Sequence, residues 1–193
     1  MAIVSSTVIQ TKFGEFRVSY HETNHGSCVS FSQGDLSKDG VIVRLHSDCL
    51  FGEVFHSLHC DCYHQLTKTM SLIHKNKCGV IVYSYQEGKG IGLKKKIEAM
   101  EIQRKEKCDS VEAFRKLGLK RSDLREYTAE MEALKDLGLA KNLRTFSGNP
   151  MKIKKLKDAG YNIVETLKID KKNLNILAKK EIKTKIEKMN YSY

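Results

Sequence analysis

The chain contains 193 residues, with 34 lysines and arginines against 23 aspartates and glutamates and a formal net charge of +11. This length fits one domain with an ordinary hydrophobic core, which does not depend on disulfide bonds. No stretch approaches the roughly 20 apolar residues of a membrane span, and the start of the chain predicts a strand rather than a signal. Because its six cysteines are also typical of a reducing compartment, we expect a cytoplasmic protein without membrane contact.

The positive charge is concentrated in the last third of the chain. Lysines between Lys152 and Lys188 are spread along helix-like segments. A solvated lysine-rich face is commoner than a dedicated nucleic-acid surface, so we interpret this charge as a contribution to solubility and encounter rate. The distribution argues against nucleic acid as a partner.

The periodicity of the apolar residues predicts strands and helices in an α/β order. Strands are expected at 3–10, 16–21, 28–32, 41–46, 79–85, 143–146 and 162–167. Helices are expected at 63–75 and 93–107, in the segment that ends at Gly138, and from Pro150 to Ala159. The stretch from Cys108 to Asp123 is predicted to be a loop, and the residues from Lys168 onward a lysine-rich helical tail.

Three cysteines form the first candidate site. Cys49 is followed, after ten intervening residues, by Cys60 and Cys62. Three thiolates and a water are the ligands of a catalytic zinc, in which the metal lowers the pKa of the water toward about 7. Two alternatives remain at this point: ordinary buried or redox-active cysteines, or a closed structural site. The fourth ligand of a closed site would be one of four histidines, His46, His56, His59 or His64.

Two glycine-containing turns form a candidate anion site. Residues 87–92 place backbone N–H groups and Lys89 at the start of a helix, and residues 147–150 do the same with Lys152. Neither pattern is specific alone. Together with Arg44 and Arg125, the two turns favour a polyphosphate ligand.

Several short segments spread over nearly the whole chain form a recognisable set. They are Arg44-Leu45-His46-Ser47-Asp48-Cys49, Cys60-Asp61-Cys62 with Gln65, Gln86-Glu87-Gly88-Lys89 with Ile91-Gly92-Leu93, Val111-Glu112-Ala113, Asp123-Leu124-Arg125-Glu126-Tyr127 and Ser147-Gly148-Asn149-Pro150-Met151-Lys152. In order and spacing these segments resemble the GTP cyclohydrolase II family. The resemblance implies a single α/β domain with a mixed β-sheet flanked by helices, with a catalytic part over residues 1–170 and a tail over 171–193 that belongs to the same domain.

The resemblance also implies an activity. Members of the family are usually homodimeric hydrolases that use zinc and magnesium to open the imidazole ring of GTP at C8. They release formate and pyrophosphate and leave a diaminopyrimidine ribosyl phosphate, in the first step of riboflavin biosynthesis. Carried over to this chain, the zinc ligands would be Cys49, Cys60 and Cys62, and Asp123 would be the general base.

Further roles follow from the same resemblance. Arg125 would act either as a nucleophile toward the α-phosphorus or as a clamp on the phosphates, and we favour the clamp because a guanidinium stays protonated. The residues implied to line the GTP site are Arg44, Leu45, His46, Ser47, Asp48, Gln65, Glu87, Gly88, Lys89, Ser110, Ser147 and Lys152.

The sequence departs from the family pattern at several positions. Lys89 and Gly90 stand where the family has arginine and asparagine, and Met100 stands where it has a catalytic-site tyrosine. A thioether has no proton to donate. One interpretation is that Met100 only completes an apolar stripe with Leu93 and Ile97. A second is that hydrolysis of the formamide stalls, which would leave a formamidopyrimidine nucleotide as product. A third is a non-catalytic guanine-nucleotide binding protein.

Overall fold

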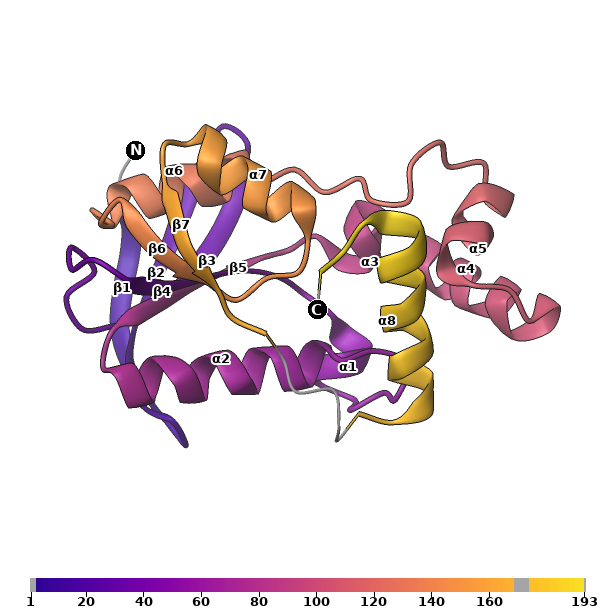
Figure 1. The fold of residues 1–193 in the computed structure, drawn as a ribbon, viewed down its shortest axis with the longest axis horizontal. Helices are drawn as coiled ribbons and strands as arrows, with labels where there is room; N and C mark the ends of the chain where they lie inside the picture. The colour runs from indigo at the N-terminus through magenta and orange to yellow at the C-terminus, as the bar shows by residue number, and fades with distance from the viewer. Residues whose placement is uncertain (1–2, 169–173, 193) are drawn as a thin grey trace. The chain divides into compact units, whose positions relative to one another are not determined.

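The computed structural model of the chain describes residues 3–168 and 174–192. The strands are β1 (Ile3–Thr11), β2 (Gly14–Thr23), β3 (Gly26–Gln33), β4 (Val41–Ser47), β5 (Gly79–Ser84), β6 (Asn142–Thr145) and β7 (Asn162–Thr166). The helices are α1 (Leu50–Glu53), α2 (Cys62–Asn76), α3 (Glu87–Gly90), α4 (Gly92–Glu106), α5 (Ser110–Lys116), α6 (Thr128–Asp136), α7 (Pro150–Asp158) and α8 (Ile176–Met189) (Figure 1). In this described part of the chain, no helix has the length and apolar character needed to cross a membrane.

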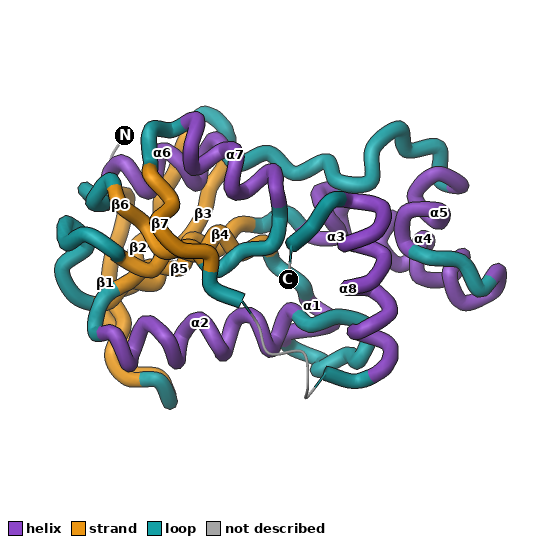
Figure 2. Tube along the Cα trace, viewed as in Figure 1, coloured by secondary structure: helices purple, strands orange, loops and turns teal. Residues whose placement is uncertain are grey.

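The seven strands form one mixed sheet in the order β1-β2-β3-β5-β4-β6-β7 (Figure 2). The pairs β1–β2, β2–β3 and β3–β5 are antiparallel, whereas β4–β6 and β6–β7 are parallel. Parallel neighbours need a crossover connection, and α7 supplies the one between β6 and β7. The predicted α/β class, with a mixed sheet flanked by helices, is confirmed.

Helices cover both faces of the sheet. Successive residues of a strand point to opposite faces, so the odd-numbered residues of β4 pack with α6 and α7 while Ile42 packs with Ile73 of α2. Figure 1 shows α2 on one side of the strands and α6 and α7 on the other. Arg44 and His46 follow Ile42 at even spacing, which places both side chains on the α2 face.

By its internal packing the chain forms two compact units. The first contains the sheet, α6, α7 and most of α2. The second contains Ser47–Tyr63, Gln86–Glu126 and the segment with α8, and it has apolar clusters of its own around Phe114 and Ile182. The boundary expected between residues 170 and 171 lies outside the described residues and stays a prediction.

One stretch that was predicted to be a loop is partly helical. Residues Ser110–Lys116 form α5, whose N-terminus is capped by Asp109 through hydrogen bonds from the backbone N–H groups of Val111 and Glu112. Phe114 anchors the helix in its apolar cluster. The loop prediction was wrong because a helix of two turns is too short for its periodicity to stand out.

Candidate functional site

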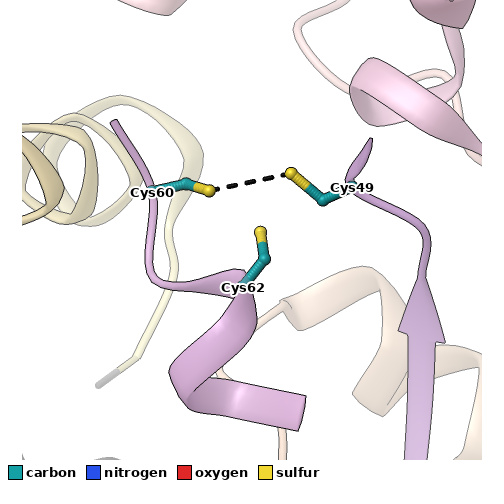
Figure 3. A group of neighbouring side chains, drawn as sticks. All are labelled: Cys49, Cys60 and Cys62. Carbon is teal, nitrogen blue, oxygen red and sulfur yellow. Dashed lines mark hydrogen bonds between the residues drawn. The ribbon is translucent and has the colours of Figure 1, made fainter. Parts of the chain in front are cut away.

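Three thiols meet in the second unit. Cys49 immediately precedes α1, Cys60 lies in the loop that follows this helix, and Cys62 begins α2. Their sulfur atoms all lie within 4.8 Å of one another, and 3.7 Å separates those of Cys49 and Cys60 (Figure 3). Of the histidines described in this unit, neither His56 nor His59 joins the group. The cluster therefore consists of three cysteine sulfur atoms.

The spacing of the sulfur atoms fits a zinc ion. A zinc–sulfur bond is about 2.3 Å long, so two sulfurs of a tetrahedral site lie about 3.8 Å apart. This agrees with the 3.7 Å between the sulfur atoms of Cys49 and Cys60. A zinc ion held by three protein ligands would keep a fourth position for water, as catalytic zinc ions do.

A glycine makes room for the sulfur atoms. Gly52 is buried in α1, and a Cβ atom at this position would lie 2.6 Å from the sulfur of Cys60 and 3.2 Å from that of Cys49. Gly52 is not among the glycines with positive φ. The close sulfur atoms, and not the backbone conformation, therefore explain why a residue without a side chain stands here.

Lys96 of α4 connects the thiols to a buried carboxylate. Its Nζ lies 3.3 Å from the sulfur of Cys49 and donates to Oε1 of Glu87 at 2.7 Å. The backbone N–H of Leu50 donates to Oε2 of Glu87 at 2.7 Å, so this carboxylate joins the start of α1 to α4. Burial and the nearby Glu87 carboxylate raise the pKa of Asp48 to about 6. Two predicted substrate residues, Asp48 and Glu87, thus lie beside the thiol cluster.

Hydrogen bonds among the three thiols shift their pKa values in different directions. Hydrogen bonds from Cys60 and Cys62 lower the pKa of the Cys49 thiol, and the ammonium of Lys96 acts in the same direction. Sharing with Cys49 raises the pKa of Cys60 to about 11 and raises that of Cys62 as well. The ammonium of Lys96, 3.3 Å from the sulfur of Cys49, favours the thiolate form of this residue, and binding of a metal ion would require all three thiols to lose their protons.

The predicted catalytic residues Asp123 and Arg125 form a two-armed ion pair. Nε and Nη2 of Arg125 donate to the two carboxylate oxygens of Asp123 at 2.8 and 2.5 Å. Nη1 of Arg125 lies 3.4 Å from the hydroxyl of Ser47, a predicted substrate residue. The hydroxyl of Tyr191 accepts from Nη2 at 2.8 Å and donates to Asp123 at 3.3 Å. Sequence analysis did not identify Tyr191, because none of the matching segments includes it.

The predicted phosphate loop folds as a tight turn. Gly88 and Lys89 both adopt left-handed backbone conformations, with φ of 64° and 62°. The backbone N–H of Leu124 donates to the carbonyl of Lys89 at 2.9 Å. A Cβ at Gly90 would lie 2.9 Å from the carbonyl carbon of Leu124 and 3.0 Å from the backbone nitrogen of Arg125. The departure from asparagine at position 90 thus accompanies a close backbone approach that only glycine permits.

Lys89 lies among polar groups from two other helices. Its Nζ donates to the hydroxyl of Ser110 at 3.0 Å and lies 3.1 Å from a carboxylate oxygen of Glu181 in α8. Burial lowers the pKa of Lys89, although Glu181 opposes this shift. Two predicted substrate residues, Lys89 and Ser110, are therefore in contact, and Glu181 is a neighbour that sequence analysis missed.

In the first unit, Arg44 joins two other predicted substrate residues. Its Nε donates to Nδ1 of His46 at 2.8 Å, its Nη2 donates to the side-chain oxygen of Gln65, and its Nη1 donates to the carbonyl of Phe146 at 2.6 Å. Arg44 is only 5% exposed. The network therefore holds the guanidinium in a fixed orientation at the end of β4.

The remaining predicted substrate residues of this unit lie near the start of α7. Nζ of Lys152 donates to the carbonyl of Leu45 at 2.6 Å. The hydroxyl of Ser147 accepts from the backbone N–H of Asn149, whose own side chain caps α7. Lys152 is 5% exposed, so the prediction of a solvated lysine face is wrong at this residue.

Met100 lies on α4 with a half-buried side chain. Two residues expected to share an apolar stripe with it, Leu93 and Ile97, are 38% and 50% exposed. The buried residue of this helix is Ala99. The stripe is therefore not a core-facing surface. Lys96, one turn before Met100, is a neighbour of the thiol cluster that sequence analysis missed.

Comparison with known proteins agrees with the geometry. A family model described as GTP cyclohydrolase II matches residues 2–168. "Riboflavin biosynthesis protein RibBA" of Chlorobium phaeovibrioides is 40% identical over 186 residues, which cover 95% of this chain and 44% of that protein. "GTP cyclohydrolase-2" of Archaeoglobus fulgidus is 36% identical over 191 residues, which cover 98% of this chain and 49% of that protein. The chain thus spans about half the length of these curated relatives.

Among solved structures, the chain is similar to RibBX, a two-domain 3,4-dihydroxy-2-butanone 4-phosphate synthase from A. baumannii, with a TM-score of 0.45 and 15% identity over 86% of this chain and 39% of that chain. The match of the family model extends over most of the sequence and includes the three clustered cysteines and the Asp123–Arg125 pair. The chain therefore belongs to the GTP cyclohydrolase II family.

Proposed function

We propose that this protein opens the imidazole ring of GTP at C8 by zinc-dependent hydrolysis and releases pyrophosphate, as a step of riboflavin biosynthesis in the cytoplasm. The observation that carries the proposal is the three-thiol cluster of Cys49, Cys60 and Cys62, which leaves a fourth metal position for water. The names of the relatives, which refer to GTP cyclohydrolase and to riboflavin biosynthesis, support the reaction and the pathway.

The three thiolates would hold the zinc ion. When bound, zinc supplies a water whose pKa is lowered toward about 7 for attack on C8. Lys96 offsets part of the negative charge of the thiolates, since its ammonium lies 3.3 Å from the sulfur of Cys49. In the described part of the chain, the three cysteines are the one group of three or more side chains placed to hold a metal ion. Because magnesium in nucleotide sites is commonly bound through substrate phosphates, we assign it to the triphosphate of GTP.

We assign the proton transfers and the phosphate contacts to charged groups of the second unit. Asp123 is the general base, and Arg125 binds the phosphates as a clamp, because a guanidinium that stays protonated is a poor nucleophile but stabilises developing negative charge. Lys89 and Ser110 offer an ammonium and a hydroxyl 3.0 Å apart, a pair suited to a phosphate oxygen. The other substrate contacts of this unit are assigned to Ser47, Asp48, Glu87 and Gly88.

In the first unit we assign substrate contacts to two groups of residues. The first is the network of Arg44 with His46 and Gln65, in which the guanidinium is held by three acceptors. The second comprises Leu45, Ser147 and Lys152. Fixed donors of this kind bind an anion with little loss of side-chain entropy.

We also propose that the protein is a homodimer. An edge strand, β1, is exposed along nearly its whole length and carries Val4 and Val8, which are 57% and 45% exposed. Exposed apolar edge strands favour pairing with another chain. Sedimentation should give twice the chain mass for the wild type and a monomer for Val8→Lys; a monomeric wild type would contradict this part of the proposal.

The activity is tested with purified, zinc-loaded protein, GTP and magnesium. We expect loss of the purine absorption band together with release of pyrophosphate. Cys60→Ser should abolish both signals, whereas Cys108→Ser, which lies outside the cluster, should preserve them. Nucleotide binding without pyrophosphate release would instead favour a non-catalytic guanine-nucleotide binding protein.

A second candidate product follows from Met100. If the missing phenol is needed to hydrolyse the formamide, the protein releases a formamidopyrimidine nucleotide and no formate. Mass spectrometry of the product and a formate assay distinguish the two outcomes. Met100→Tyr should then restore formate release and Met100→Leu should not, whereas stoichiometric formate from the wild type would exclude this variant.

A further inference from the structure

One face of helix α8 is turned toward the predicted substrate residues of the second unit. Glu181, Lys185 and Met189 recur at four-residue spacing, which places them on the same side of the helix. Glu181 pairs with Lys89 at 3.1 Å, and the sulfur of Met189 lies 3.7 Å from the same ammonium. Nζ of Lys185 lies 3.7 Å from a carboxylate oxygen of Asp61, between two of the clustered cysteines. This face is therefore built from specific contacts and is not a solvated lysine surface.

The end of α8 directs the chain back toward the catalytic pair. Asn190 adopts the left-handed conformation, with φ of 56°, which asparagine tolerates better than most residues. The backbone N–H of Tyr191 then donates to the carbonyl of Lys185 at 3.1 Å. This turn brings the phenol to Arg125 and Asp123.

The phenol closes a three-membered set of hydrogen bonds. Nη2 of Arg125 donates both to Asp123 at 2.5 Å and to the Tyr191 oxygen at 2.8 Å, while the Tyr191 hydroxyl donates to the same oxygen of Asp123 at 3.3 Å. Burial raises the pKa of Tyr191, although Arg125 opposes this shift, so the phenol keeps its proton and remains a donor. Arg125 and Asp123 thus each gain a further hydrogen bond that restricts the rotation of their side chains.

We propose that Tyr191 is a positioning residue for the ring-opening reaction, which holds Arg125 and Asp123 in the orientation that they need to act on the nucleotide. The inference rests on the proposed function, since it assigns Tyr191 a role in that same reaction. It also gives the C-terminal segment, which lies beyond the region matched by the family model, a part in the chemistry.

The kinetic test is Tyr191→Phe, which removes only the hydroxyl. A hydrogen bond to a charged group contributes about 1.5–3 kcal/mol, so we expect kcat to fall about 10- to 160-fold while KM for GTP changes less than about twofold. Tyr20→Phe is the matched control, because Tyr20 lies on β2 and is 36% exposed, and it should leave both constants unchanged. An unchanged kcat for Tyr191→Phe would overturn the proposal. A rise in kcat/KM would overturn it as well, since it would mean that the segment competes with the substrate.

A second test does not depend on activity. The free energy of unfolding is measured for the wild type, Tyr191→Phe, Arg125→Ala and the double variant. Because the two side chains are in contact, we expect the double variant to lose less stability than the sum of the single variants. Strict additivity would show that the contact is absent and would overturn the proposal. A wild type that binds GTP but does not turn it over would contradict the proposed function alone, because the cycle would still report on the Tyr191 contact.

Discussion

Replacing Gly52 with alanine tests whether the three sulfur atoms act as one metal site. The added Cβ would lie 2.6 Å from the sulfur of Cys60, whereas ordinary nonbonded contacts are roughly 3.5–4.0 Å. The sulfur must therefore move by about 1 Å, although metal–ligand distances tolerate only about 0.2 Å. We expect Gly52→Ala to remove one of the three sulfur ligands from the metal.

Gly52→Ala should change the stability of the metal-free protein much less than it changes zinc affinity. Alanine is favoured over glycine in a helix by about 1 kcal/mol, and overpacking a buried position costs about 1–3 kcal/mol. The cost should lie at the low end, because Cys60 is in a loop and its side chain can rotate away. The free energy of unfolding should therefore change by no more than about 2 kcal/mol. Zinc affinity should fall at least about 100-fold, the upper limit for changes outside the ligands themselves.

Two measurements separate these effects. Zinc affinity is obtained by competition with a chromophoric chelator, and the free energy of unfolding by urea denaturation without metal. Val54→Ala is the matched control, since Val54 ends the same helix and is 62% exposed. A Gly52→Ala protein that binds zinc as tightly as the wild type would refute the reasoning, because the sulfur atoms could then not hold the ion at their observed positions.

Lys96→Met leaves the Glu87 carboxylate, whose side chain is 10% exposed, without its ammonium partner. We expect urea denaturation to show that the free energy of unfolding falls by about 3 kcal/mol, and that adding Glu87→Gln largely restores it. No recovery in the double variant would contradict the pairing. Burial lowers the pKa of His21 below its usual 6.5, so the folded protein binds fewer protons than the unfolded chain and its stability should fall as the pH drops through about 6.5. His21→Gln should weaken this dependence, and an equal slope would exclude His21 as its source. Cys60→Ser should lose zinc by elemental analysis while Cys108→Ser retains it; retention by both would argue against the cluster.

Most strands and helices could be predicted from local sequence patterns. The central strands β4 and β5 are short apolar runs that become almost completely buried, and the end of α7 is marked by Gly160 just as its start is marked by Pro150. The exception was α5, where Asp109 provides the cap but the helix is too short for a clear period. Even the order of strands in the sheet could not be inferred, because pairing such as β5 with β4 joins residues far apart in the chain.

The candidate site shows the same division. Residue types and their spacing indicated Cys49, Cys60 and Cys62 as one set, since cysteine thiolates are typical zinc ligands. Only the three-dimensional contacts revealed the role of Gly52. A side chain at this position would collide with the clustered sulfur atoms. The contacts also revealed Tyr191, which meets Arg125 from a segment 66 positions away. Local sequence carries information about conformation and ligand chemistry, whereas contacts between distant segments depend on how the whole chain packs.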